Sequence, residues 1–191
     1  MSGCQRSESF RMRRSARNDN SLIVRFFDKV IRDYNCGDVK RLLRRESLTL
    51  GPLLACVAAG IDAVGGMLFG FGRRNSRHRS VRFLNEMMKV DCATAEAIYC
   101  FARCGYVHEG IGKLALSWFA GYSGGTAGYV MYRRADGGLA LDIAELARRY
   151  LRAVDVVSKN QRHRLRHLPK GSEDEVSLIR RLSGARKLSR A

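Results

Sequence analysis

The chain has 191 residues, of which 46% are hydrophobic, so it can bury a core, and this argues against a wholly disordered chain. Its 35 lysines and arginines outnumber 18 acidic residues, which gives a formal net charge of +17. Such an excess says little about fold but favours a polyanionic partner: RNA, DNA or an anionic membrane surface. We expect one domain over residues 21–159, between a basic arm (1–20) and a basic tail (160–191) that contains a candidate short helix.

The cysteines and the first residues bear on the compartment. Six cysteines are scattered along the chain without a CxxC pair, and the first twenty residues are polar and basic. This pattern is typical of free thiols in a reducing cytoplasm rather than of a secreted, disulfide-bonded protein. Cys100, Cys104 and His108 follow one another at four-residue spacing, but without a fourth ligand we predict buried thiols, no metal site and no cofactor.

The first half of the chain predicts an arm followed by two helices. Residues 1–20 are expected to be disordered. Apolar residues then recur at helical spacing over residues 21–35, and Cys36-Gly37 would end that helix. The most apolar stretch, 48–71, contains a single charged residue, Asp62, and predicts a buried central helix of a soluble bundle. Its length would also allow a membrane span, but five glycines, a proline and the carboxylate disfavour that alternative.

The second half predicts three more helices and a pair of strands. The run GRRNSRHRSVR is typical of an exposed loop that leads into a helix, and Asp91 would begin another helix that stops near Gly105. Short aromatic and β-branched stretches at 114–119 and 128–133, joined by a Gly-rich turn, predict a β-hairpin. A turn at Asp136-Gly137-Gly138 and an amphipathic helix over 139–159 follow. The expected fold class is therefore mainly α, a bundle of four or five helices with a small β-hairpin insertion.

The segment from Arg103 to Glu109, RCGYVHE, carries the most specific pattern. Arg103 and His108 are separated by four residues, which resembles the motif of the HEPN superfamily. The wider frame resembles a group of bacterial HEPN-like proteins with an "IDxxGG" helix, an "NSxxR" loop and an "IYxxxRCGxxHE" segment. The resemblance covers roughly residues 48–158, and the matching positions are Ile61, Asp62, Gly65, Gly66, Asn75, Ser76, Phe83, Ile98, Tyr99, Arg103, Cys104, Gly105, His108 and Glu109.

The resemblance implies a HEPN-like bundle that acts as a metal-independent endoribonuclease in bacterial defence or as a toxin. Histidine can exchange the protons of the reaction near neutral pH, and arginine can hold the charge that develops on phosphate. Because one pair supplies few groups, the resemblance implies a homodimer in which two motifs face each other. The expected catalytic residues are Arg103 and His108, and the supporting residues are Asp62, Tyr99, Cys104 and Glu109.

Alternatives to catalysis remain open. Five residues along a continuous helix rotate by about 140°, so Arg103 and His108 converge only if the helix ends near Gly105 or if two subunits share the site. Active HEPN enzymes usually have a polar residue where this chain has Cys104. The same residues therefore also fit a scaffold within a catalytically inactive module that binds nucleic acid or a protein. Which antitoxin or other protein partner this chain would have is not indicated.

Charged residues outside the motif predict contacts with RNA and within the fold. Asp62 would need a partner if buried, and Arg103 is the natural candidate. Exposed basic runs would extend the RNA-binding surface. The arginines expected to bind nucleic acid are Arg73, Arg74, Arg77, Arg79, Arg133, Arg134, Arg162, Arg164 and Arg166.

Overall fold

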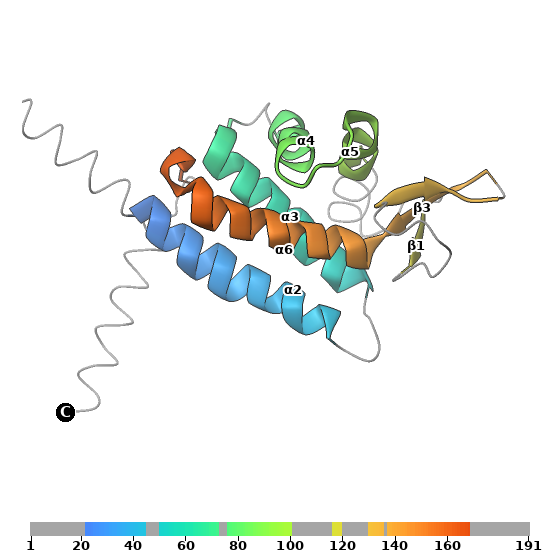
Figure 1. Cartoon of the computed structure of the whole chain (residues 1–191), viewed down its shortest axis with the longest axis horizontal. Coiled ribbons are helices and arrows are strands. Elements are labelled where there is room, and N and C mark those ends of the chain that lie inside the picture. Colours follow the sequence, from blue (N-terminus) through green and yellow to red (C-terminus); the bar gives the residue numbers. More distant parts are fainter. Residues whose placement is uncertain are drawn as a thin grey trace, which may run out of the picture.

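The computed structural model describes residues 22–44, 50–72, 76–100, 116–119, 130–135 and 137–168, with backbone alone at 116–119 and 132. Over these ranges the chain is mainly helical, with five α-helices, α2 to α6. The long helices lie alongside one another, α4 and α5 cover one side of them, and a few short strands lie at one end (Figure 1). The predicted arm (1–20) and the candidate helix of the tail lie outside the described residues, and the predicted domain boundaries stay predictions.

The N-terminal helix is longer than the sequence pattern indicated. Residues 22–26 are α-helical, η1 (Phe27–Asn35) is wound as a π-helix, and α2 (Cys36–Leu43) continues without a break because Asn35 keeps right-handed helical angles. The predicted end at Cys36-Gly37 is therefore wrong. Cys36 and Val39 are both buried, so the apolar stripe continues past Gly37 and outweighs the cost of about 1 kcal/mol for a glycine inside a helix.

The central helix is confirmed as α3 (Leu50–Phe69). It packs against α4 and α6 on different sides and also contacts α2 and η1. Among the described residues it is the one helix long and apolar enough to cross a membrane, with a mean hydropathy of 1.8, and 56% of that window is buried within the protein. The burial agrees with a core helix, while a cytoplasmic location stays a prediction.

Two shorter helices cover α3. The predicted helix after the basic run is α4 (Ser76–Glu86), and it buries Val81 and Leu84. It begins at Ser76, within the basic run, so the second half of that run is helical. The predicted start of the next helix is confirmed, because Asp91 caps α5 (Cys92–Ile98) by accepting a hydrogen bond from the Thr94 amide. The expected stop near Gly105 lies outside the described residues.

The predicted hairpin is wrong in its pairing. β1 (Leu116–Phe119) and β2 (Met131–Arg133) are separated by β3 (Leu139–Asp142), in the order β1-β3-β2. β1 is parallel to β3 and β2 is antiparallel to it. The expected turn after β2 is present at Gly137, which has a φ of +82° that glycine adopts readily.

The last helix consequently begins later than its pattern suggested. Residues 139–142, expected to be helical, form β3, and α6 (Ile143–Asn160) starts only after Asp142 accepts a hydrogen bond from the Glu145 amide. The apolar residues of 139–141 fit either structure, and pairing with two neighbouring strands decides between them. The expected buried face of the helix is confirmed at Ile143, Leu146 and Tyr150.

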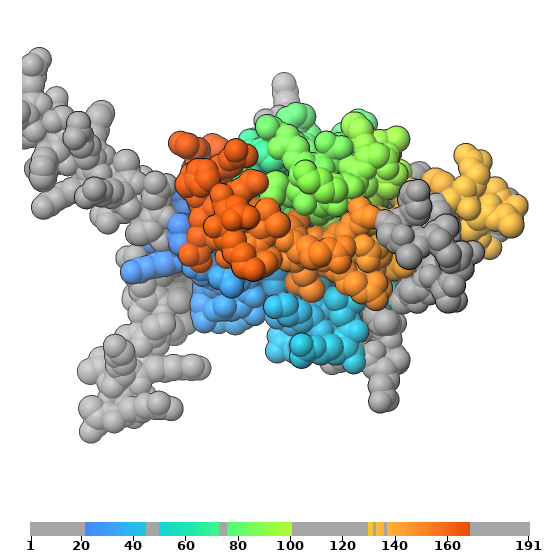
Figure 2. All heavy atoms as spheres, in the orientation of Figure 1, coloured from blue at the N-terminus to red at the C-terminus, as the bar shows by residue number. Residues whose placement is uncertain are grey.

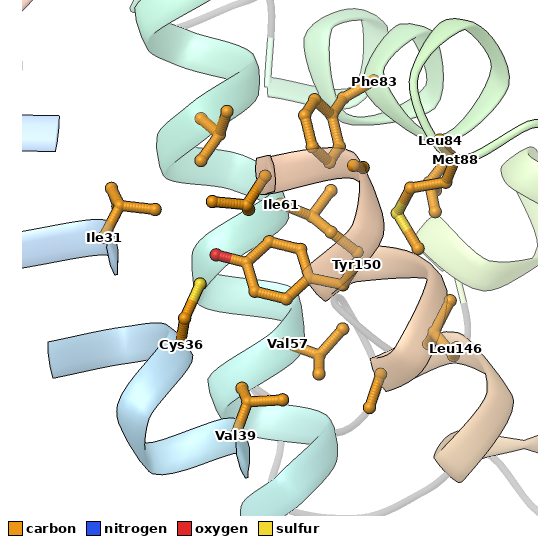
Figure 3. Packing of buried hydrophobic residues seen from close by; sticks show 14 of the residues in the cluster. Ile31, Cys36, Val39, Val57, Ile61, Phe83, Leu84, Met88, Leu146 and Tyr150 are labelled. Atoms are coloured by element: carbon orange, nitrogen blue, oxygen red, sulfur yellow. The ribbon is translucent and has the colours of Figure 1, made fainter. Parts of the chain in front are cut away.

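A single core joins these elements, with Tyr150 at its centre. Figure 3 shows its ring among apolar side chains from α2, α3 and α4, with the hydroxyl beside Cys36. The hydroxyl donates to Asn35 Oδ1 over 2.7 Å, and the Asn35 amide donates to the Cys56 carbonyl over 2.9 Å. A methyl group on Gly60 would lie 2.2 Å from the hydroxyl oxygen, so only glycine lets Tyr150 cross α3 here.

Candidate functional site

A charged cluster lies between α3 and α4, centred on Asp62. Asp62 Oδ1 accepts hydrogen bonds from Arg79 Nε (3.0 Å), Ser76 Oγ (3.2 Å) and Ser80 Oγ (3.2 Å). Its other oxygen, Oδ2, accepts from Arg79 Nη2 over 3.1 Å. Tyr99 at the end of α5 reaches the same group, with its hydroxyl 3.5 Å from Ser76 Oγ. We call these five residues the Asp62 cluster.

The sequence builds this cluster by helical spacing and by one close helix contact. Ser76, Arg79 and Ser80 are spaced by three and four residues along α4, so they share the face that meets Asp62. Gly65, three residues after Asp62, lets the α4 backbone approach, because a methyl group there would lie 2.9 Å from the Arg79 carbonyl oxygen. The Arg79 guanidinium also lies over the Phe71 ring at 5.4 Å and donates to the Gly72 carbonyl over 3.3 Å.

The charges of the cluster are largely withdrawn from water. The side chain of Arg79 is 9% exposed and that of Asp62 is 21% exposed. A buried ion pair offsets its desolvation only when hydrogen bonds complete the geometry, and here the two serines and the two-pronged guanidinium supply them. The cluster therefore ties α3 to α4, and the Tyr99 hydroxyl brings the end of α5 within 3.5 Å of it.

One predicted role is wrong and another pairing stays open. Arg79 was expected to be an exposed contact for nucleic acid, but it is buried and its guanidinium is bound to Asp62. The basic run enters α4 at Ser76, which turns Arg79 inward. Asp62 does have a charged partner, as its burial requires, and Arg79 is one such partner. The expected pair with Arg103 lies outside the described residues.

The residues of the motif itself also lie outside the described residues: Arg103, Cys104, His108 and Glu109. Their roles stay predictions. The described chain reaches Tyr99 and Cys100, which continue α5 as a helix, and the RCGYVHE segment starts at Arg103, four residues after Tyr99 of the Asp62 cluster. The pattern S-x-x-R-S facing a lone carboxylate in an apolar helix could have indicated this cluster from sequence.

The arginines expected to bind nucleic acid have several environments. Arg77 donates to Glu96 over 2.7 Å, and this hydrogen bond raises its pKa, while Arg162 is paired with Asp28. Four others are exposed, and two lie outside the described residues. The exposed ones are Arg133, Arg134, Arg164 and Arg166. The two outside are Arg73 and Arg74.

The exposed arginines form two separate groups rather than one surface. β3, which pairs with β2, leads directly into α6, and residues 164–166 follow its other end. The 18 residues of α6 span about 27 Å at 1.5 Å per residue. A single short RNA segment therefore does not meet both groups through one local contact.

Cofactor and metal chemistry find little support in the described part of the chain. The hollow beside the cluster, between Ser80, Ile98 and Tyr99, has a volume of about 10 Å³, close to the room needed for one water. Across the described ranges no three His, Cys, Asp or Glu side chains gather as metal ligands. Burial raises the pKa of Cys36 and of Cys56, so neither thiol is an activated nucleophile.

Comparison with known proteins identifies no relative. Neither a protein-family model, nor a curated protein, nor a solved structure matches this chain.

Proposed function

We propose that this protein is a HEPN-like RNA-binding protein with metal-independent endoribonuclease activity, for which Arg103 and His108 provide the chemistry. The observation that carries the proposal is the place of Tyr99. Its hydroxyl lies 3.5 Å from Ser76 Oγ, which itself donates to Asp62. Arg103 follows Tyr99 by four residues, and a helix end that contacts the charged cluster can hold two reactive side chains in a defined place.

The cleavage needs two proton transfers and one cation. A base removes the proton of the 2′-hydroxyl, which attacks the adjacent phosphorus, and an acid protonates the departing 5′-oxygen. His108 suits the proton transfers, and Arg103 suits the charge that develops on the phosphate oxygens. Because one His cannot be base and acid in the same step, a homodimer with two facing motifs supplies both groups.

The Asp62 cluster acts by positioning rather than by chemistry. Both oxygens of Asp62 are engaged by Arg79, so the carboxylate is not free to take a proton from RNA. Its contribution is to fix α3 and α4 against the end of α5. A bacterial defence or toxin setting comes from the resemblance alone and is part of the same proposal.

The test is cleavage of several single-stranded RNAs by the purified full chain in EDTA, beside His108→Ala and Arg103→Ala. The chain offers a matched control in His78, which also has an Arg five positions earlier and lies exposed on α4. We expect His78→Ala to cleave like the wild type, whereas each motif variant loses at least about a hundredfold in rate. Thermal melting and gel filtration check that all variants fold and assemble alike.

Two outcomes contradict the proposed activity. Cleavage that persists in His108→Ala would point to a contaminating nuclease or another site. An intact wild type that cleaves none of the RNAs would favour the second candidate, RNA binding without catalysis. The second candidate is favoured by Arg164 and Arg166, which are exposed and not required for the cleavage chemistry. Under that candidate His108→Ala binds RNA as tightly as the wild type.

A further inference from the structure

The segment after α6 is built into the protein body rather than trailing from it. The amides of Arg166 and His167 both donate to the Met67 carbonyl, over 3.0 and 3.3 Å, near the end of α3. Leu165 is 2% exposed and belongs to the core. At the start of the segment, Arg162 pairs with Asp28 of η1. Residues 161–168, which we call the C-terminal strap, are therefore fixed on both sides.

The strap presents unpaired positive charge to solvent. Arg164, the last residue of the 3-10 helix η4 (Arg162–Arg164), and Arg166 flank the buried Leu165 and are both exposed. In the described part of the chain neither has an ion-pair partner, whereas Arg77, Arg82 and Arg162 each have one. The sequence of the strap, QRHRLRHL, contains no acidic residue.

A second basic group flanks the same end of α3. The Arg82 guanidinium lies 4.2 Å from the centre of the Phe69 ring, with 46% of its side chain exposed. His167 approaches the neighbouring position, since a methyl group on Gly70 would lie 3.9 Å from its Nε2. Figure 2 shows the orange-red strap beside the green residues of α4 on one face. Arginines from two distant parts of the sequence, α4 and the strap, thus lie near one helix end.

Helix capping alone does not account for these side chains. The C-terminal end of α3 carries partial negative charge, which favours nearby cations, and the carbonyl groups of its last turn need hydrogen-bond donors. Backbone amides of the strap already provide the donors. The guanidinium groups of Arg164 and Arg166 are left for a partner outside the chain.

We propose that this end of α3, with Arg82, Arg164 and Arg166, is the docking surface for single-stranded RNA; this deepens the proposed RNA-binding function and rests on it. The two strap arginines bind successive phosphates. Arg82, whose guanidinium lies 4.2 Å from the centre of the Phe69 ring and pairs with Glu86, offers a planar cation on which an unpaired base stacks. Bases are accessible for such stacking only in a single strand, so duplex RNA of the same sequence binds more weakly.

The experiment measures binding of a labelled, 2′-O-methylated single-stranded RNA by fluorescence anisotropy, because this RNA cannot be cleaved through its 2′-hydroxyl. Arg164→Glu/Arg166→Glu is compared with Lys40→Glu/Arg44→Glu. This control pair is exposed at the end of α2, away from the Asp28–Arg162 pair at the start of η1, and it lowers the formal net charge of +17 by the same four units. Arg82→Lys keeps the positive charge but removes the planar guanidinium group. If the double Glu variant of the strap fails to fold, Arg164→Gln/Arg166→Gln replaces it.

We expect the strap variant to lose about tenfold or more in affinity and the slope of log K against log salt to flatten by about 1.4, from two lost phosphate contacts. The control pair changes affinity less than about threefold, and Arg82→Lys weakens single-stranded RNA several-fold without affecting duplex RNA. Equal losses in the strap and control variants would overturn the proposal in favour of diffuse charge.

Further outcomes distinguish failure of the proposed docking surface from failure of the proposed RNA-binding function. A wild type that binds RNA tightly while the strap variant binds equally well overturns the surface alone. A wild type that binds no RNA overturns the RNA-binding function together with it. If the strap variant instead loses binding to vesicles of phosphatidylcholine and phosphatidylserine while keeping RNA affinity, the surface is a lipid contact and the proposal is wrong.

Discussion

α3 contacts two buried polar regions of different kinds, one neutral and one charged, at positions only two residues apart. At Gly60 the helix receives the hydroxyl of Tyr150, which is neutral and is satisfied by one hydrogen bond to Asn35. At Asp62 the helix receives the guanidinium of Arg79 and two serine hydroxyls. Two residues along a helix rotate by about 200°, so the regions face different neighbours, α6 and α4.

The two regions differ in what packing requires of them. A neutral hydroxyl in a core needs one partner, and Tyr150 obtains it at little cost. A buried ion pair usually stabilises a fold no better than apolar residues of similar volume. The Asp62 region therefore has more charge than packing requires, and Tyr99, which contacts it, precedes Arg103 by four residues in the sequence. The predictions below test this difference.

The largest effect is expected at the charged region. Asp62→Ala leaves the Arg79 charge buried without its carboxylate, which costs about 3–5 kcal/mol in the free energy of unfolding. Urea denaturation measures this loss. A loss below about 1 kcal/mol would mean that Arg79 reaches water and that the pair contributes little.

The double variant Asp62→Leu/Arg79→Met then separates packing from positioning. Removing both charges should recover most of the lost stability, because apolar residues can replace the pair. RNA cleavage should remain impaired in kcat with RNA affinity unchanged, since the variant loses the fixed orientation of α4 and α5. Full recovery of cleavage would show that the cluster is only structural.

A smaller effect is expected where Tyr150 crosses α3. Gly60→Ala places a methyl group 2.2 Å from the hydroxyl oxygen and 2.7 Å from Asn35 Oδ1, and the shifts needed cost about 1–3 kcal/mol. Gly37→Ala is the matched control, because it lies inside α2 with nothing within 4 Å of the new methyl group. This control should gain about 0.5–1 kcal/mol. Equal effects at both glycines would remove the basis for the close contact.

The neutral region should also respond to alkaline pH. Burial raises the pKa of Tyr150 well above its ordinary value of 10.0, so the folded state keeps a proton that the unfolded state releases. Stability is therefore full below pH 10 and falls above it by about 1.4 kcal/mol per pH unit from this group. Tyr150→Phe should lose about 1 kcal/mol at neutral pH from the missing hydrogen bond and show a flatter decline above pH 10. Parallel declines in the two proteins would argue against a neutral buried phenol.

The smallest effect is expected at a carboxylate outside both regions. Burial raises the pKa of Glu145, but hydrogen bonds from Arg152 and Arg149 outweigh it and lower the pKa below 4.5. The stability from this group is present above the unfolded pKa and is lost as pH falls through the folded one. Glu145→Gln should therefore cost about 0.5–1 kcal/mol at pH 7 and almost nothing near pH 2. A cost as large as that of Asp62→Ala would erase the distinction between Glu145, whose partners Arg148 and Arg152 are more than half exposed, and Asp62, whose partner Arg79 is 9% exposed.

The sequence was informative where a pattern depends on neighbours along the chain. Spacing of apolar residues predicted α3 and the buried face of α6, and Asp91 was correctly predicted to begin α5. Prediction failed where the decision depends on distant segments. The stretch 139–142 became a strand because two other strands pair with it, and the N-terminal helix continued through Gly37 because Cys36 and Val39 meet the core.

The candidate site divides in the same way. The sequence by itself determined the charge, the helical class and the need of Asp62 for a charged partner, since these follow from composition and from local periodicity. Only the tertiary structure decided that Arg79 is that partner, that it is therefore unavailable to RNA, and that the strap brings Arg164 and Arg166 to the end of α3. Those choices depend on which helices approach closely, and Gly60 and Gly65 permit an approach that the sequence pattern does not specify.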